Sequence, residues 1–166
     1  ERIAFVTGPL TLRSAIARKA AFEESLREIG KVVDPQLIIE GDHTMEGGMR
    51  ALARLANEPH RPSAIMCSND MTAIGVMREA FDMGISIPQE LSVIGFDDVR
   101  LAQFVIPPLT TVQMSQTEIA RLAFKALISE LERDEPSPNG TQYLMQTNLV
   151  LRNSTALAPR ASSAQR

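Results

Sequence analysis

Residues 62–98 constrain the fold of this chain more than any other stretch. An apolar run at 64–67 stops at the polar Ser-Asn-Asp of 68–70, after which apolar residues recur at helical spacing. A second apolar run, at 91–96, stops at the paired aspartates 97–98. The pattern predicts a strand, a polar turn, a helix and a second strand. Because parallel strands end at one edge of their sheet, and ligands bind at that edge, we expect the polar residues after both strands to face a ligand together.

The preceding residues repeat the alternation of strand and helix. Strands are expected at 2–8 and 36–40, and helices at 13–29 and 45–58, each with apolar residues at the period of that element. Continuous apolar strands separated by amphipathic helices are typical of a sheet that is buried on both faces. The sequence therefore predicts an α/β fold, with a doubly wound parallel sheet and helices on both faces.

The alternation changes after residue 98. Residues 99–106 are irregular, and the prolines at 107–108 cannot donate hydrogen bonds to a sheet. The later elements are expected to be an extended segment at 109–112, a helix at 115–133 opened by a Ser-x-x-Glu capping box, a turn at 134–140, a strand at 142–151, and a polar tail from 156. The last third of the chain thus departs from simple repetition of strand and helix.

Composition limits the classes of function. The chain of 166 residues has the size of one ordinary domain, is 44% hydrophobic and 22% charged, and has no long apolar run that would span a bilayer. Its formal charge of -3 argues against binding a polyanion by itself. The single cysteine, Cys67, excludes an internal disulfide, and its apolar neighbours favour core packing over a role as nucleophile. Because the chain starts at Glu1, next to the first strand, we expect it to be a piece of a longer protein.

Four motifs in this order carry a resemblance to a known family. They are Pro-Ser-Ala-Ile with Ser-Asn-Asp-Met-Thr-Ala-Ile-Gly at 62–75, Gly-Ile-Ser-Ile-Pro-Gln-Glu-Leu-Ser-Val-Ile-Gly-Phe-Asp-Asp at 84–98, Pro-Pro-Leu-Thr-Thr-Val at 107–112, and Leu-Val-Leu-Arg-Asn-Ser-Thr at 149–155. With them the chain resembles the effector-binding domain of the lac and galactose repressor family of transcription regulators. The resemblance extends over nearly all of residues 1–155.

The resemblance implies a type I periplasmic-binding-protein-like fold, in which the ligand lies between two similar lobes joined by three crossovers. Residues 1–108 resemble most of the second, C-terminal lobe. Residues 109–141 look like the crossover and helix of the other lobe, most of which is missing, and 142–155 look like the returning strand. Residues 156–166 are expected to be a disordered tail. The family's DNA-binding helix-turn-helix would lie outside this chain, and the regulator would be cytoplasmic.

Asn69 and Asp97 are the strongest candidates for ligand binding. In the resembled family the Asn of the Asn-Asp pair and the first Asp of Gly-Phe-Asp-Asp contact the effector, and a carboxylate bonds two adjacent hydroxyls well. The alternatives are a helix cap or turn for Asn69 and a strand-end turn for Asp97. We expect Asp70 to cap the helix that follows it, and Asp98 to be a hinge or structural residue.

Three further side chains are expected at the ligand. Arg18, ten residues after Gly8, stands where the family places an Arg that forks onto ligand hydroxyls or a carboxylate, and the alternative is a solvated helix charge. Ser14, one turn earlier, either adds a hydrogen bond to the ligand or caps the helix start. His43 stands where relatives often carry a stacking aromatic residue, and the alternative is an exposed histidine in a turn.

Apolar residues that could lie outside the core predict self-association. Met71, Phe104, Val105 and Ile106 stand where relatives have their dimer interface, although plain core packing would also explain them. The helix at 115–131 has an apolar face whose partner in the family is missing. We expect that face to pack on another copy, by swapping or dimerisation, unless the helix shifts.

We interpret the sequence as the small-molecule-sensing and dimerising part of a DNA-binding transcriptional repressor. Its effector would be a sugar or related polar metabolite, its partner a second copy in a homodimer, and operator DNA would be bound only through the absent helix-turn-helix. The alternative is an extracytoplasmic sugar-binding protein of a transport system.

An enzyme is disfavoured, because the sequence has no glycine-rich phosphate loop, no nucleophile elbow and no metal-spaced set of His or Cys. No cofactor and no metal are expected. A Mg²⁺ site at Asp70, Asp97 and Asp98 is disfavoured, because adjacent carboxylates on a strand point to opposite faces.

Overall fold

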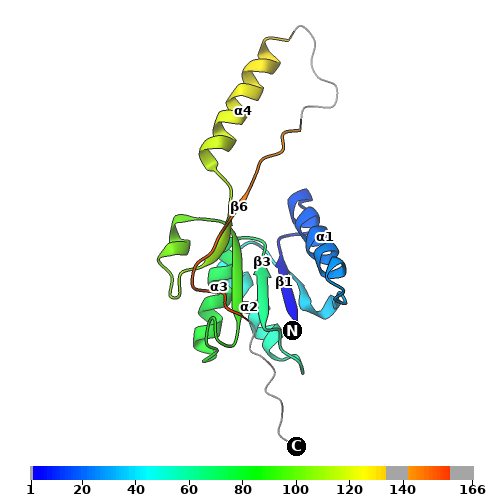
Figure 1. The fold of residues 1–166 in the computed structure, drawn as a ribbon, viewed down its shortest axis with the longest axis vertical. Coiled ribbons are helices and arrows are strands. Elements are labelled where there is room, and N and C mark those ends of the chain that lie inside the picture. The colour runs from blue at the N-terminus through cyan, green and yellow to red at the C-terminus, as the bar shows by residue number, and fades with distance from the viewer. Residues whose placement is uncertain (1, 134–141, 158–166) are drawn as a thin grey trace, which may run out of the picture.

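The structure, a computed structural model, describes residues 2–133 and 142–157. Figure 1 shows a body, in which a sheet lies between helices, and a long arm formed by one helix and the segment that returns from it. Strand β5 (Thr110–Gln113) leads directly into the arm and is parallel to its neighbour in the sheet. The arm therefore stands at the carboxyl edge of the sheet, which is the edge where ligands bind in folds of this kind.

The sheet has six strands in the order β2-β1-β3-β4-β5-β6. Their bounds are Ile3–Thr7 for β1, Ile38–Glu40 for β2, Ala64–Cys67 for β3, Ser92–Asp97 for β4, Thr110–Gln113 for β5 and Asn148–Val150 for β6. The first five strands are parallel, whereas β6 runs antiparallel to β5. The prediction of a doubly wound α/β sheet is confirmed. The predicted length of the last strand, 142–151, is wrong, because the short β5 offers partners only to residues 148–150.

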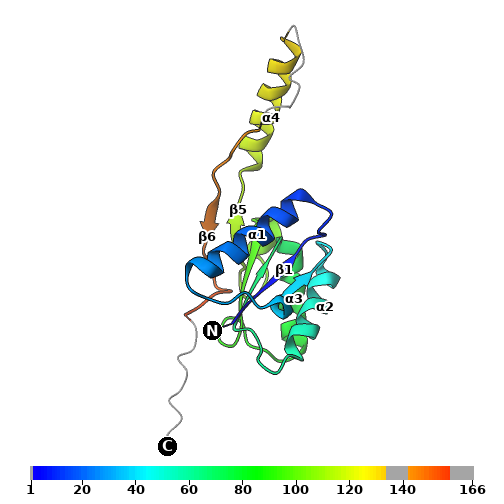
Figure 2. The same ribbon diagram turned by 90° about the vertical axis from the view of Figure 1, so that its right-hand side faces the viewer.

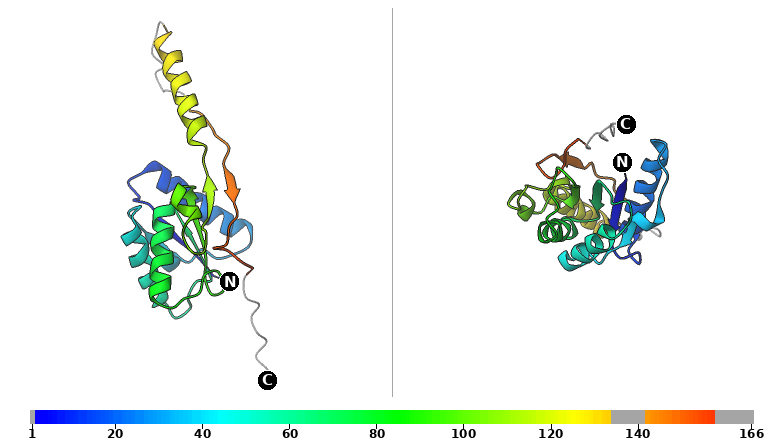
Figure 3. Two further views of the ribbon diagram at one scale, coloured as in Figure 1. Left: turned by 90° about the vertical axis from the view of Figure 1, so that its left-hand side faces the viewer. Right: turned by 90° about the horizontal axis from the view of Figure 1, so that it is seen from below.

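Helices cover both faces of the sheet, as the turned views in Figures 2 and 3 show. The α-helices are α1 (Arg13–Glu28), α2 (Met45–Ala56), α3 (Asp70–Asp82) and α4 (Gln116–Leu131), and short 3-10 turns occupy Pro35–Leu37 and Arg100–Gln103. The larger core, which includes Leu52, Leu55 and Val76, lies under α2 and α3. On the other face α1 packs through Phe22 and Leu26, and the Phe22 ring stacks on Phe5 with centroids 5.0 Å apart.

Two glycines allow α2 and α3 to pack closely. A Cβ on Gly48 would lie 2.1 Å from the carbonyl oxygen of Thr72, and one on Gly75 would lie 1.9 Å from that of Met45. Neither space is available to a methyl group, so both positions require glycine despite its low helix propensity. Because α2 and α3 each begin just after a strand, this packing also fixes the relative positions of the residues at their first turns.

Side-chain caps define the beginnings of three helices. Thr44 caps α2, Asn69 caps α3 and Ser115 caps α4, each by accepting a hydrogen bond from a backbone N–H one turn ahead. The prediction that Asp70 caps the third helix is therefore wrong. The cap at Ser115 is as predicted, but the carboxylate of Glu118 pairs with Arg121.

The arm stands clear of the body in Figures 1 and 2 and in the left view of Figure 3, and no residue of α4 is buried. Its apolar side chains include Phe124, Leu127 and Leu131, which are 64%, 56% and 71% exposed. What covers this face stays a prediction. Within the described residues, the helices are too short or too polar to cross a membrane. The predicted turn at 134–140 lies outside the described residues, as does the part of the predicted 156–166 tail from residue 158 onward.

Candidate ligand-binding site at the carboxyl edge

Four of the predicted ligand residues come together at the carboxyl edge of the sheet. Arg18 reaches this edge from α1, and His43 precedes α2. Asn69 caps α3, and Asp97 ends β4. The Asn69 amide nitrogen donates to the carbonyl of His43 at 3.1 Å, and the charges of Arg18 and His43 both act on the Asp97 carboxylate. The edge thus presents a cation, an imidazole, a carboxamide and a carboxylate side by side.

Arg18 is held by two contacts that the sequence reasoning missed. Its guanidinium carbon lies 3.8 Å from the centroid of the Phe96 ring, and one terminal nitrogen donates to the carbonyl of Ser68 at 2.6 Å. Stacking on an aromatic ring and a hydrogen bond together fix the plane of the guanidinium group. Strand alternation could have placed Phe96 next to Arg18, because successive residues of a strand face opposite sides of the sheet. Gly95 faces the core beneath α3, so Phe96 faces α1. The alternative that Arg18 is a solvated charge on the helix does not fit, because its guanidinium group contacts the Phe96 ring and the Ser68 carbonyl.

Asn69 caps its helix and also orients the neighbouring turn. Its side-chain oxygen accepts from the N–H of Thr72 at 2.9 Å, while its amide nitrogen donates to His43. The cap that we considered as the alternative to ligand binding is therefore real. Capping still leaves a donor for a ligand. The amide nitrogen of Asn69 carries two hydrogens, and only one of them is hydrogen-bonded within the described contacts.

His43 lies half-buried at the edge, with φ at 65°. Its Nε2 atom is buried and has no hydrogen-bond partner among the described residues. A Cβ on Gly8 would lie 1.9 Å from this nitrogen, so the ring rests directly on the backbone at the end of β1. The alternative of an exposed histidine in a turn is wrong. The imidazole instead occupies a place where only a glycine neighbour admits it.

Asp97 carries a strained backbone and a partly buried carboxylate. Burial raises its pKa above the ordinary value, while Arg18 and His43 act in the opposite direction. Its φ is 113°, and the next residue, Asp98, has φ of 53°. Within the described chain, the non-glycine residues with positive φ are His43, Asp97 and Asp98, all at this edge. Such torsions cost of order 1–3 kcal/mol each and cluster at ligand sites.

Among the described contacts, the remaining predicted residues form no hydrogen bond with these four side chains. Ser14 is exposed on α1, and since residue 12 is the N-cap of that helix, the alternative that Ser14 caps it is wrong. Met71, Phe104 and Ile106 are 36%, 63% and 95% exposed on the outer side of α3 and after β4. Val105 instead packs partly against the large core. Within residues 2–133 and 142–157, no group of three or more acidic, His or Cys side chains is arranged to hold a metal ion.

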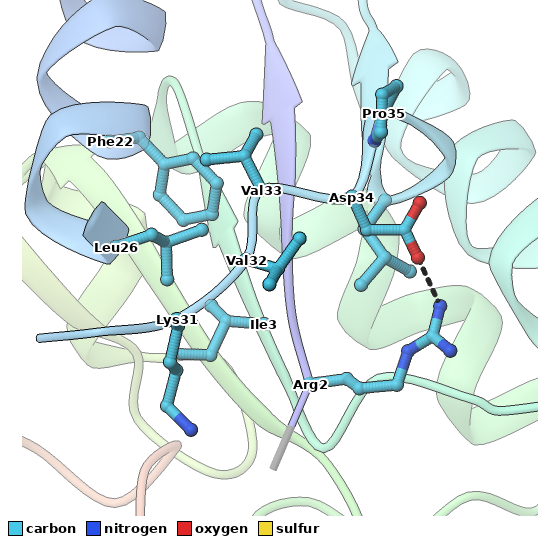
Figure 4. A pocket seen from close by; sticks show the side chains of 10 residues that line it. Arg2, Ile3, Phe22, Leu26, Lys31, Val32, Val33, Asp34 and Pro35 are labelled. Carbon is cyan, nitrogen blue, oxygen red and sulfur yellow. Dashed lines mark hydrogen bonds and ion pairs between the residues drawn. The ribbon is translucent and has the colours of Figure 1, made fainter.

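A cavity of about 420 Å³ lies at the opposite, amino edge of the sheet, between α1 and the start of β1. Figure 4 shows its walls, formed largely by the apolar side chains of Ile3, Phe22 and Leu26. Its charged groups include Arg2 and Asp34, which form an ion pair at 2.7 Å. Lys31 also lines the cavity, and Nε of Arg2 is buried without a hydrogen-bond partner among the described residues. The cavity thus holds few polar groups, whereas four polar side chains meet at the carboxyl edge.

Comparison with known proteins agrees with this geometry. Residues 1–155 match the family described as the periplasmic binding protein-like domain. The chain belongs to this family. The HTH-type transcriptional repressors CytR of Escherichia coli (strain K12) and PurR of Escherichia coli O139:H28 (strain E24377A / ETEC) are 36% and 32% identical to it, over 96% and 95% of the chain. The predicted resemblance to the lac and galactose repressor family is confirmed.

A solved structure gives the same result for the fold. The periplasmic binding protein-like chain superimposes with a TM-score of 0.83 and 32% identity on a sugar-binding transcriptional regulator of the LacI family from Escherichia coli, complexed with phosphate. The match covers 95% of this chain and 55% of that one. The chain spans about half the length of the repressors that it matches, 46% in each case. These relatives are repressors rather than enzymes, and they do not favour the alternative of a transport protein.

Proposed function

We propose that this chain is the effector-sensing part of a DNA-binding transcriptional repressor, and that it binds a small polar metabolite, a sugar or a related compound. The ligand would lie at the carboxyl edge against Arg18, His43, Asn69 and Asp97, with Ser14 adding a hydrogen bond from α1. The assembled regulator would be a cytoplasmic homodimer. Operator DNA would be bound by a helix-turn-helix outside these 166 residues, in line with the name HTH-type repressor given to both relatives.

The observation that carries the proposal is the convergence of polar side chains on a strained backbone. Asn69 retains an amide hydrogen, and Arg18 is oriented by Phe96 beside the carboxylate of Asp97. His43 packs against Gly8 next to them, and its carbonyl accepts the hydrogen bond that orients Asn69. Donors and acceptors at fixed positions suit a ligand with several hydroxyl groups, because each hydroxyl both donates and accepts. Preorganisation on strained torsions reduces the entropy lost when the ligand binds.

The arm supports a second wall for the site. We propose that residues 1–108 form one lobe, that 109–141 cross over and contribute α4 to a second lobe, and that 142–155 return. The exposed apolar face of α4 would then pack inside that second lobe or against the same helix of another copy. A lobe built around α4 would stand over the carboxyl edge, because the arm leaves the body there. Ligand between the lobes would favour one arrangement over the other.

Thermal unfolding with a panel of pentoses, hexoses, sugar phosphates and purines tests the site. A ligand at 100 times its dissociation constant stabilises the folded state by about 2.7 kcal/mol, which raises the melting temperature of a chain this size by roughly 5–10 °C. We expect Asp97→Asn and Arg18→Met to abolish the shift. Asp82→Asn, a matched change at an exposed carboxylate paired with Arg78, should retain it. A panel without any shift contradicts ligand binding by this chain.

Sedimentation velocity tests the homodimer. The proposed interface, formed by Met71, Phe104, Val105 and Ile106, includes the nearly fully exposed Ile106. Ile106→Glu should lower the association constant, because a charge would be buried against apolar surface. Ile29→Glu, at an exposed isoleucine after α1, is the matched control and should not. Equal effects of the two changes would contradict this interface.

A further inference from the structure

Two of the candidate ligand residues, Asn69 and Asp97, are each followed directly by an aspartate whose carboxylate points away from the ligand edge. Asp70 follows Asn69, and Asp98 follows Asp97. Asn69 and Asp97 lie beside His43 at the open edge, whereas both following carboxylates bind groups on β5 or on the returning segment. The same arrangement occurs at the ends of two neighbouring strands, β3 and β4. Asn69 and Asp97 are therefore each one peptide bond away from a residue whose carboxylate is anchored in the sheet.

Asp70 is fully buried and fixes three elements together. One carboxylate oxygen accepts from the hydroxyl of Thr111 in β5 at 2.5 Å, and the other accepts from the N–H of Val99, after β4, at 2.8 Å. Gly95 makes room for it, since a Cβ there would lie 2.1 Å from the Asp70 carboxylate. Burial raises the pKa of Asp70, while the hydrogen bonds from Thr111 and Val99 lower it. The first turn of α3 is thereby tied to β5.

Asp98 forms the second tie. One carboxylate oxygen accepts from Arg152 at 2.6 Å, and the other accepts from the side-chain amide of Gln113 at 2.8 Å. Arg152 and Asp98 are only 18% and 12% exposed, so water weakens this ion pair less than it would at the surface. Arg152 also donates to the carbonyl of Leu109 at 2.8 Å. The end of β4 is thus joined both to β5 and to the residue that follows β6 by two positions.

The contacts of Asp70 and Asp98 hold the part of the sheet from which the arm extends, namely β5 and the segment that follows β6. Strand β5 enters the arm, β6 leaves it, and the two pair with each other from Thr111 to Gln113. Asp97 and Asp98 both have a positive φ, a region in which few torsion angles are allowed. Backbone torsions between them therefore cannot easily compensate for a displacement of Asp97, and Asp98 would move with it. Movement at the ligand edge would therefore reach the strands that hold α4.

We propose that Asp70 and Asp98 are positioning residues that couple the ligand edge to the orientation of β5 and β6, and so to α4. The proposal rests on the proposed function, since it describes how the same site is regulated. A ligand bound to Asn69 and Asp97 would displace both carboxylates together. Thr111, Gln113 and Arg152 would pass the displacement to the arm, which gives the site and the arm two linked arrangements.

Amide hydrogen exchange on the whole chain tests the coupling without any ligand. The experiment is a double-mutant cycle. Its four proteins are the unchanged chain, Asp97→Asn, Arg152→Met and the double variant. Asp97→Asn is expected to change the exchange rates of β5 and β6 amides by about fivefold or more in the unchanged background. In the Arg152→Met background, Asp97→Asn should change the exchange rates of the same amides by less than about twofold. A change of that size is within the deviation found between sites that do not interact.

Three controls separate coupling from simple structural support. Asp82→Asn should leave the β5 and β6 rates unchanged. Arg152→Lys keeps a charge for Asp98 and should restore part of the effect of Asp97→Asn, which a loss of stability alone would not do. Gln113→Met removes the other side-chain hydrogen bond to the Asp98 carboxylate, and replaces Arg152→Met in the cycle if that variant fails to fold.

Two outcomes overturn the proposal. One is an effect of Asp97→Asn on β5 and β6 that is equal in both backgrounds, and the other is no effect in the unchanged chain. Because the cycle uses no ligand, its failure leaves the proposed ligand site in place. Conversely, the absence of any ligand-induced thermal shift would refute ligand binding by this chain without affecting the measured coupling.

Discussion

The small side chain of Ser154 should make a large contribution to the free energy of unfolding. It is fully buried in the segment that returns after β6. Its hydroxyl accepts from the N–H of Thr110 in β5 at 2.8 Å and donates to the carbonyl of Val93 in β4 at 2.6 Å. The backbone adds a third link, since the carbonyl of Ser154 accepts from the N–H of Val93 at 2.8 Å. One small side chain therefore fastens the returning segment to two strands.

Ser154→Ala would leave a buried N–H and a buried carbonyl without their side-chain partner. Each orphaned group costs about 1–3 kcal/mol, the N–H more than the carbonyl because a carbonyl oxygen has a second lone pair. The expected loss is about 2–4 kcal/mol in the free energy of unfolding, or a fall of about 4–16 °C in the melting temperature for a chain of this size. The backbone link between Ser154 and Val93 should survive, so the segment stays in place.

Urea unfolding followed by circular dichroism measures this loss. Ser25→Ala, at an exposed serine on α1, makes the same chemical change and should alter stability by less than about 0.5 kcal/mol. The m-value should be the same in all three proteins, since none of the changes alters the surface exposed on unfolding. A loss below about 1 kcal/mol for Ser154→Ala would refute the reasoning that its two hydrogen bonds fasten the segment.

Three further predictions follow from single residues. Cys67 is fully buried and burial raises the pKa of its thiol, so a thiol reagent should modify the folded chain far more slowly than the urea-unfolded chain. Gly75→Ala should lower the melting temperature, because a cost of about 1–3 kcal/mol from the clash with Met45 exceeds the gain in helix propensity of about 1 kcal/mol. Hydrogen bonds from Thr44, and the charge of Arg50, hold the pKa of Asp42 below its ordinary value. Asp42→Asn should therefore be less stable than the unchanged chain at pH 7, and melting curves should converge as the pH falls through that lowered pKa.

The sequence by itself determined the layers of the fold and the edge that carries the candidate site. Apolar runs of strand length separated by amphipathic helices specify a parallel sheet, and parallel strands bring their carboxyl ends to one edge. Asn69 and Asp97 could be placed there because each directly ends or follows a strand. Arg18 and His43 were placed there through the family resemblance rather than through periodicity.

Only the tertiary structure decided which partners these residues have. The stacking of Arg18 on Phe96, the contact of His43 with Gly8 and the link from Asp98 to Arg152 join residues 35 to 78 positions apart, and no local pattern encodes such contacts. The cap of α3 is Asn69 rather than the predicted Asp70 for the same reason. Both can cap a helix, and the choice was made by Thr111 and Val99, which bind the Asp70 carboxylate within the folded sheet. Local chemistry limits what each side chain can do, and packing selects among those options.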